Sequence, residues 1–314
     1  MRYESFDRDK FNVVTMISNP ANFSSRYRLF KKFESYILEH TPNLWVCELQ
    51  LGDRPFAITD ANNPRHIQLR HWDELWHKEC ALNIAISRLP DDWETCAWID
   101  ADVHFLQKDW ISDTLNQLQV YKIVQMFDTA VDLGPSGQVL QVHKSFMGQY
   151  IQKGAVHPDT AYTAWHPGYA WAARREAIDD IGGLYDKSVL GAGDRAMALS
   201  FVTKAEQSFH PKTSSAFQKS IMDYQDRCEV ALRRDVGYVP GTIVHDFHGK
   251  KRDRRYWDRW QILIKNDYRP NVDLKRNSYG IYQLHDDMTP RSIRLRDEIR
   301  AYFRSRMEDS VDLE

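Results

Sequence analysis

The sequence predicts an α/β domain of three layers, in which helices cover both faces of a mainly parallel central sheet and a helical extension follows. Strand-like and helix-like patterns alternate along the first hundred residues, which is typical of such sheets. An apolar run also ends abruptly in Asp100 and Asp102, and ligands of parallel sheets bind beyond the carboxyl ends of the strands. With 314 residues, 42% of them hydrophobic, the chain can bury a large core. We place the main domain at 1–265 and the extension at 266–314.

Each element is predicted from a local pattern. Short apolar runs bounded by turn residues indicate strands, and apolar residues at helical spacing indicate helices. Thr289 and Pro290 suit the N-cap and first position of a final helix. The connection at 132–153 is polar and contains glycine, so we expect a mobile loop or an acceptor-side insertion there. The expected elements are strands at 11–17, 44–51, 95–100, 121–127 and 241–245 and helices at 27–40, 72–89, 110–118, 195–201 and 291–307.

Composition gives little support to several other classes of protein. The formal net charge of −2 provides no overall electrostatic attraction for a polyanion, although local basic patches can still provide one. Four cysteines without a C-x-x-C pair fit a reducing compartment. No apolar stretch reaches the roughly 18 to 20 residues that cross a bilayer, and the polar start lacks a signal-peptide core. We therefore expect a soluble, cytoplasmic protein without a transmembrane segment.

Asp100-Ala101-Asp102 is the most informative motif. Two carboxylates at the end of a buried strand are hard oxygen ligands at the edge of the sheet, where a divalent cation and a phosphate can bind. The D-x-D pattern also occurs by chance, and the alternative is a solvated turn at the end of a strand. The alternating elements around the motif favour the metal site.

Asp194 is the second candidate. It follows Gly191-Ala192-Gly193 and opens an apparent helix, so it can be either a simple N-cap or a functional carboxylate. Considered alone, the cap is the more frequent outcome, because aspartate is strongly preferred at that position.

A third cluster contains His245 and His248, followed by a cationic run at 250–259. Histidine is a frequent metal ligand, and lysine and arginine suit phosphate. Alternation along a strand would present only one of the two histidines to a metal, and His245 is favoured because it directly follows the apolar run. The alternative is one structural histidine and a solvated basic helix face.

Taken in order, the strand at 98–105, the segment 168–176, the Gly182-Gly183-x-x-Asp186 turn and the Gly-x-Gly-Asp at 191–194 resemble the GT-A fold glycosyltransferases, most closely family 2. The resemblance spans residues 11 to about 250. It implies that Asp100 and Asp102 hold Mn²⁺ or Mg²⁺ together with a donor diphosphate, and that Asp194 is the general base of an inverting reaction. Many relatives have glutamate where this chain has Gly193, which leaves the acceptor contacts of that glutamate unassigned.

The resemblance implies further site residues. A late histidine, His245 or His248, joins the metal, and a basic segment contacts the diphosphate. The implied donor-binding residues are Thr15, Ser18, Glu48, Lys78, Asn83, Asp100, Lys250, Lys251 and Arg252, and the acceptor side is assigned to Trp165, His166, Tyr169 and Trp171.

We therefore expect a metal-dependent hexosyl- or pentosyltransferase that moves a sugar from a nucleoside-diphosphate sugar to an acceptor hydroxyl, with inversion. A nucleotidyltransferase is one alternative, but it needs a glycine-rich, cationic loop after the first strand, which 18–22 does not offer. A non-catalytic carbohydrate- or nucleic-acid-binding protein is another, suggested by ten tryptophans and the basic patch. The acceptor stays open between a glycan, a lipid-linked glycan, a protein and a modified nucleic-acid base.

Overall fold

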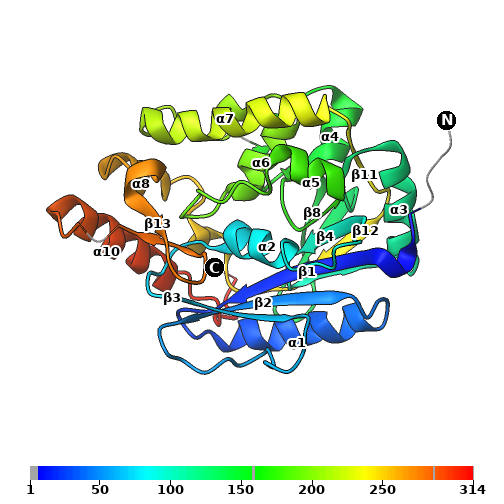
Figure 1. Ribbon diagram of the computed structural model, residues 1–314, viewed down its shortest axis with the longest axis horizontal. Coiled ribbons are helices and arrows are strands. Elements are labelled where there is room, and N and C mark those ends of the chain that lie inside the picture. The colour runs from blue at the N-terminus through cyan, green and yellow to red at the C-terminus, as the bar shows by residue number, and fades with distance from the viewer. Residues whose placement is uncertain (1–5, 158–159, 286, 314) are drawn as a thin grey trace.

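The computed structural model describes residues 6–157, 160–285 and 287–313, and its centre is a seven-stranded sheet (Figure 1). All strand pairs of this sheet are parallel except those of β10, which runs antiparallel to β4 and β6. The predicted mainly parallel sheet is thereby confirmed. In spatial order the strands are β11 (Val236–Tyr238), β6 (Ile123–Gln125), β10 (Ala170–Arg174), β4 (Thr95–Ile99), β1 (Phe11–Ser18), β2 (Leu44–Leu51) and β3 (His66–His71).

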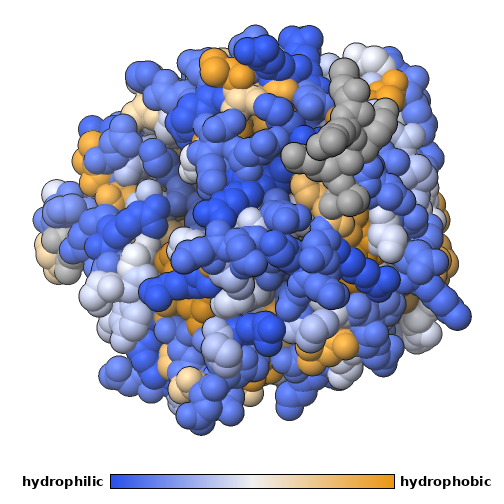
Figure 2. Space-filling view, turned by 45° about the vertical axis from the view of Figure 1, so that its right-hand side comes forward, coloured by the Kyte–Doolittle hydropathy of each residue, from blue (hydrophilic) through white to orange (hydrophobic). Residues whose placement is uncertain are grey.

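Helices cover both faces of the sheet, as a three-layer sandwich requires. Successive residues of a strand point to opposite faces, and Val13 and Val14 of β1 accordingly belong to two different core clusters. Helices α1 (Ser24–Leu38) and α3 (Trp110–Val120) pack on the Val13 face. The Val14 face carries α2 (Lys78–Ile86), α4 (Phe146–Lys153), α5 (Arg175–Ile181), α6 (Gly193–Phe201) and α7 (Ser215–Leu232). Figure 2 shows that the outer surface on one side is mostly hydrophilic, with scattered hydrophobic patches.

The segment 132–153 is not the loop that its polarity predicted. It contributes to a second sheet, whose order is β5 (Val103–Phe105), β12 (Thr242–His245), β7 (Thr129–Leu133), β8 (Val139–Ser145) and β9 (Trp165–His166), and then forms α4. A tight turn at 134–138 joins β7 to β8, with Gly137 at a φ of 78°. Alternating hydrophobicity did not predict this hairpin, because it buries the polar residue Asp132 in an inward position.

Other boundaries also differ from the expectation. Helix α2 begins only at Lys78 rather than near residue 72, and β3 precedes it where no strand was predicted. The later elements are α8 (Trp260–Lys265), α9 (Pro270–Asp273), the hairpin of β13 (Leu274–Arg276) and β14 (Tyr282–Leu284), and α10 (Pro290–Arg304).

The predicted start of the final helix matches the structure, since the Thr289 side chain accepts a hydrogen bond from the Ser292 amide. Leu295 and Ile299 of α10 join the same core cluster as Val14. The extension therefore shares a core with the central sheet. Among the described residues, no helix has the length and apolar character needed to span a bilayer.

Candidate active site

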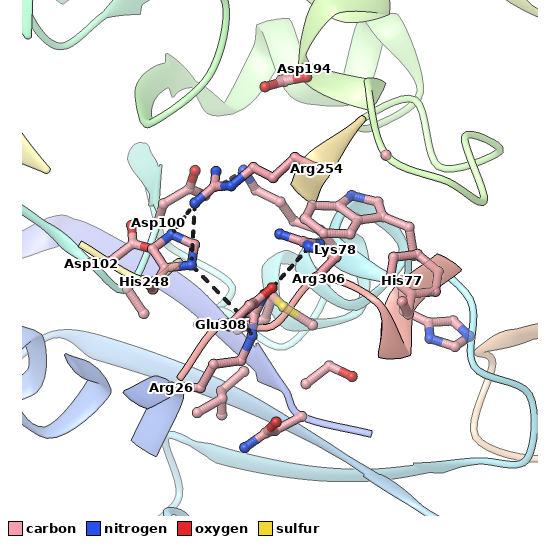
Figure 3. Close-up of a pocket in the computed structure, with 18 of the residues that line it drawn as sticks. Arg26, His77, Lys78, Asp100, Asp102, Asp194, His248, Arg254, Arg306 and Glu308 are labelled. Carbon is pink, nitrogen blue, oxygen red and sulfur yellow. Dashed lines mark hydrogen bonds and ion pairs between the residues drawn. The ribbon is translucent and has the colours of Figure 1, made fainter. Parts of the chain in front are cut away.

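A cavity lies beyond the carboxyl ends of β1 and β4, where α6 and the segment after α10 close around it (Figure 3). This is the edge at which parallel sheets bind ligands. The polar residues of its lining that matter below are Ser18, Arg26, Lys78, Asp100, Asp102, His166, Tyr169, Asp194, His245, His248, Arg254, Arg306 and Glu308.

Asp102, His245 and His248 form a candidate metal-binding group. Each offers one ligand atom, and these atoms all lie within 4.8 Å of one another. The Asp102 carboxylate is 3.0 Å from His248 Nε2 and 3.7 Å from His245 Nε2. Burial alone would raise the pKa of Asp102, but His245 and His248 outweigh it and hold that pKa below its usual range. The carboxylate is therefore ionised and able to bind a cation.

Both histidines reach this group because the strand ends earlier than alternation assumed. Strand β12 ends at His245, so the period of two does not apply to residues 246–248. The Asp246 amide donates to the Asp102 carbonyl at 2.9 Å, which joins the two loops. The Asp246 side chain turns away and pairs with Lys32. The structure thus brings together His245 and His248, of which the sequence favoured only one.

Asp132 lies directly behind His245 and was not predicted. Its Oδ1 is 3.0 Å from His245 Nδ1 and accepts from the Tyr169 hydroxyl at 2.7 Å. Its Oδ2 contacts His143 Nε2 and Lys251 Nζ. Burial would raise the pKa of Asp132, but the hydrogen bonds from His143 and His245 outweigh it and lower that pKa strongly. An aspartate in a buried hairpin strand was the available signal, and the assignment of a loop concealed it.

Asp100 lines the cavity but stands outside the group of three. Its carboxylate pairs with Lys78 Nζ at the first residue of α2. Burial raises the pKa of Asp100, and the positive charge of Lys78 offsets only part of this rise. Burial would lower the pKa of Lys78, but Asp100 and Glu79 raise it above its usual value. The two predicted site residues Asp100 and Lys78 therefore form one ion pair beside the candidate metal group.

Asp194 faces the same cavity from the other side, as Figure 3 shows. The N-cap of α6 is Ala192, with a left-handed φ of 70°, so Asp194 lies inside the first turn and is not the cap. One carboxylate oxygen accepts from the Arg195 amide at 2.8 Å. A β-carbon at Gly193 would lie 2.5 Å from the Glu79 carboxyl carbon. A side chain at position 193 would therefore clash with Glu79 unless Glu79 moved.

Within the predicted cationic run at 250–259, Arg254 lies beside the metal group, whereas the predicted donor-binding residues Lys250, Lys251 and Arg252 do not line this cavity. Arg254 Nη2 lies 2.8 Å from His248 Nε2. Arg26 of α1 and Arg306 after α10 line the same cavity. Residues 250–252 instead line a separate cavity behind His245, where Lys251 pairs with Asp132. Residues 251–254 form a 3-10 turn, and Arg254 at its end lines the cavity.

Among the other predicted contacts, Ser18, His166 and Tyr169 line the cavity and five residues do not. Glu48 is buried and accepts from the Ala57 and Thr59 amides at 2.7 Å, so it organises a loop. Thr15 donates to the Ile99 carbonyl between two strands. The remaining residues outside the cavity are Asn83, which bonds to Leu184, and Trp165 and Trp171, which are buried in the core.

No family model matches the sequence, and no curated protein matches it. Among solved structures, a nucleotide-diphospho-sugar transferase candidate from Desulfovibrio desulfuricans has 12% identity and a TM-score of 0.30, over 93% of this chain and 98% of its own. The catalytic domain of Drosophila β1,4-galactosyltransferase 7 in complex with xylobiose has 13% identity and a TM-score of 0.38, over 88% and 94%. Glucosyl-3-phosphoglycerate synthase from Mycobacterium tuberculosis in complex with Mg²⁺ and UDP has 12% identity and a TM-score of 0.36, over 82% and 76%.

Because these three superpositions have TM-scores below 0.5, we base the functional proposal on the site itself.

Proposed function

We propose that this protein is a glycosyltransferase that depends on a divalent metal and moves a sugar from a nucleoside-diphosphate sugar to an acceptor hydroxyl. The observation that carries the proposal is the shared cavity. A three-residue metal group and Asp194 face it from opposite sides, at the edge of the sheet where ligands bind. Glycosyl transfer needs this separation, because the leaving diphosphate and the attacking hydroxyl lie on opposite faces of the sugar when the reaction inverts the anomeric carbon.

Asp102, His245 and His248 would hold the metal. Two imidazoles and one carboxylate suit a transition ion such as Mn²⁺ better than Mg²⁺, which prefers oxygen ligands. The bound ion would neutralise charge on the leaving diphosphate.

Arg254 and Arg26 support the diphosphate side, since guanidinium groups bind phosphate oxygens through paired hydrogen bonds. Lys78, held by Asp100, lies in the same lining and extends the positive side of the cavity. Ser18, at the end of β1, lines the cavity, and we assign it to the nucleoside.

Asp194 is the proposed general base. It would take the proton of the acceptor hydroxyl as the new carbon–oxygen bond forms, while the nucleoside diphosphate leaves with the electron pair of the old bond. His166 and Tyr169 stack on one another with ring centroids 3.7 Å apart and line the cavity, and we assign them to the acceptor side.

The first test identifies the nucleotide part of the donor. A panel of nucleoside diphosphates is screened by thermal shift with and without Mn²⁺, because a ligand that binds only the native state raises the melting temperature. We expect a rise that requires the metal. A panel without any metal-dependent rise would contradict the proposal.

Asp194→Asn then tests the mechanism. We expect the variant to keep metal and donor affinity and to lose roughly 10²- to 10⁴-fold in transfer rate, the usual contribution of a positioned base. Asp180→Asn, an exposed position on α5, is the matched control and should transfer normally. Near-normal transfer by Asp194→Asn would remove this residue from the mechanism.

A further inference from the structure

Each candidate metal-ligand histidine has a buried carboxylate on its far side. His245 directs Nε2 at Asp102 and Nδ1 at Asp132, 3.0 Å away. His248 directs Nε2 at Asp102, 3.0 Å away, and has Glu308 3.6 Å from Nδ1. Arg254 Nη2 also lies near this ring, 2.8 Å from Nε2 and 3.3 Å from Nδ1. Asp132 and Glu308 are each only 3% exposed. The carboxylate partner of His245 comes from β7, and that of His248 comes from the segment after α10; Figure 3 shows His248 and Glu308.

A carboxylate at Nδ1 determines which ring nitrogen can bind a metal. An ionised carboxylate only accepts hydrogen bonds, so its partner nitrogen carries the proton and the other nitrogen keeps a free lone pair. Burial would raise the pKa of Glu308, but Arg26 and Arg306 outweigh it, and its pKa lies well below the usual range. The 3.0 Å contact of Asp132 Oδ1 with His245 Nδ1 therefore leaves Nε2 of His245 as its metal-binding atom. Glu308 stands on the corresponding Nδ1 side of His248, at 3.6 Å.

The position of Glu308 is fixed by several contacts. Arg26 Nη2 donates to its Oε1 at 2.8 Å, and Arg306 Nε lies 2.9 Å from the same oxygen. The neighbouring Asp309 accepts from the Ser24 and Ser25 amides at 2.9 and 2.7 Å, where α1 has no side-chain cap of its own. The segment after α10 is thus anchored to the start of α1, and this anchoring presents Glu308 to His248.

We propose that Asp132 and Glu308 are the positioning residues of the metal site, which hold His245 and His248 with both Nε2 atoms facing Asp102. The proposal rests on the metal-dependent function proposed above. It assigns the segment 305–310 a role in the site, since this segment supplies the carboxylate for the second histidine.

The test measures Mn²⁺ affinity by EPR titration on wild type, Asp132→Asn and Glu308→Gln. We expect each variant to bind Mn²⁺ roughly 10- to 100-fold more weakly, the usual effect of removing an outer-shell carboxylate. Asp246→Asn is the matched control. Its carboxylate is also buried beside the histidines but pairs with Lys32 and His104, and its Mn²⁺ affinity should match wild type.

A second measurement separates positioning from a merely structural role. Nitrogen-15 NMR of the histidine rings, with diamagnetic Zn²⁺ bound, reports which ring nitrogen carries the proton. We expect Nδ1 to be protonated on both rings in wild type, and the fraction to fall for His248 in Glu308→Gln. The NMR comparison of Glu308→Gln with wild type remains informative even if Asp132→Asn fails to fold, since that variant also loses contacts to His143 and Tyr169.

The outcomes distinguish this proposal from the proposed function. Failure of wild type to bind Mn²⁺ overturns the metal site and the positioning role together. Tight binding in wild type with unchanged affinity in folded Glu308→Gln and Asp132→Asn overturns only the positioning role.

Discussion

Asp100 and Asp102 are one residue apart in sequence but are placed in different environments. Asp102 faces two histidines, whereas Asp100 pairs with Lys78. Asp102→Asn should weaken Mn²⁺ binding by at least about a hundredfold, because loss of a ligand costs more than loss of an outer-shell partner. Asp100→Asn should leave Mn²⁺ affinity without donor nearly unchanged and weaken donor binding, since Lys78 loses the carboxylate that positions it. Calorimetric titration of both variants checks this, and equal losses of Mn²⁺ affinity would show that both aspartates bind the metal.

The sequence predicted the residues that follow recognisable strands, and it missed those whose roles depend on distant contacts. Asp102, Asp194 and both histidines stand in local patterns of glycine, apolar and acidic residues. Glu308 stands in an unremarkable charged stretch after a helix, and distant contacts with Arg26 and with the start of α1, which Asp309 caps, bring it near His248. No spacing rule connects positions 60 residues apart, so this carboxylate could not be inferred before the fold was known.

At the scale of elements, the link between β9 and β10 positions the proposed base. A β-carbon at Gly168 would press against a carboxylate oxygen of Asp194. Gly168→Ala should therefore rotate Asp194 away and lower transfer by about 10²-fold, the cost of a misplacement of about 1 Å. Mn²⁺ affinity should be unchanged, because the metal group is on the other side of the cavity. Parallel measurement of transfer rate and Mn²⁺ affinity tests this, and a loss of both would indicate a general distortion.

Periodicity predicted the elements of the central sheet better than those around it. Strands β1, β2 and β4 are buried on both faces and were recognisable as largely apolar runs. Strand β8 exposes Val139 and Val142 and buries His143, which reverses the usual alternation of a half-buried strand. The inward His143 contacts Asp132 behind the candidate site. The polar residues that obscured the strand pattern therefore support the proposed site.

At the scale of the whole molecule, the cavity collects side chains from nearly the entire chain. Arg26 lies near its start, Asp102 and Asp194 come from its middle, and Glu308 comes from the segment after the last helix. The sequence predicted the layers and the sheet edge at which they meet. It did not predict that the extension returns to that edge, because an amphipathic helix such as α10 shows which face it buries but not where it packs.

Glu79 offers a test of how this crowded arrangement affects global stability. It is 2% exposed, and burial raises its pKa to about 8 from the usual 4.5. Between these two pH values the unfolded chain loses the proton while the folded protein keeps it, so this residue makes the free energy of unfolding fall as pH rises. Below 4.5 both states are protonated, and the contribution disappears.

Glu79→Gln removes this titration and keeps the shape that fits against Gly193. We expect equal unfolding free energies for variant and wild type below pH 4.5, and a variant more stable by an amount on the order of a few kcal/mol above pH 8. Urea unfolding across this range measures the difference, which should grow steadily between the two limits. A difference that is constant with pH would mean that Glu79 is ionised in the folded protein, and that Lys78 compensates its charge beneath the cavity.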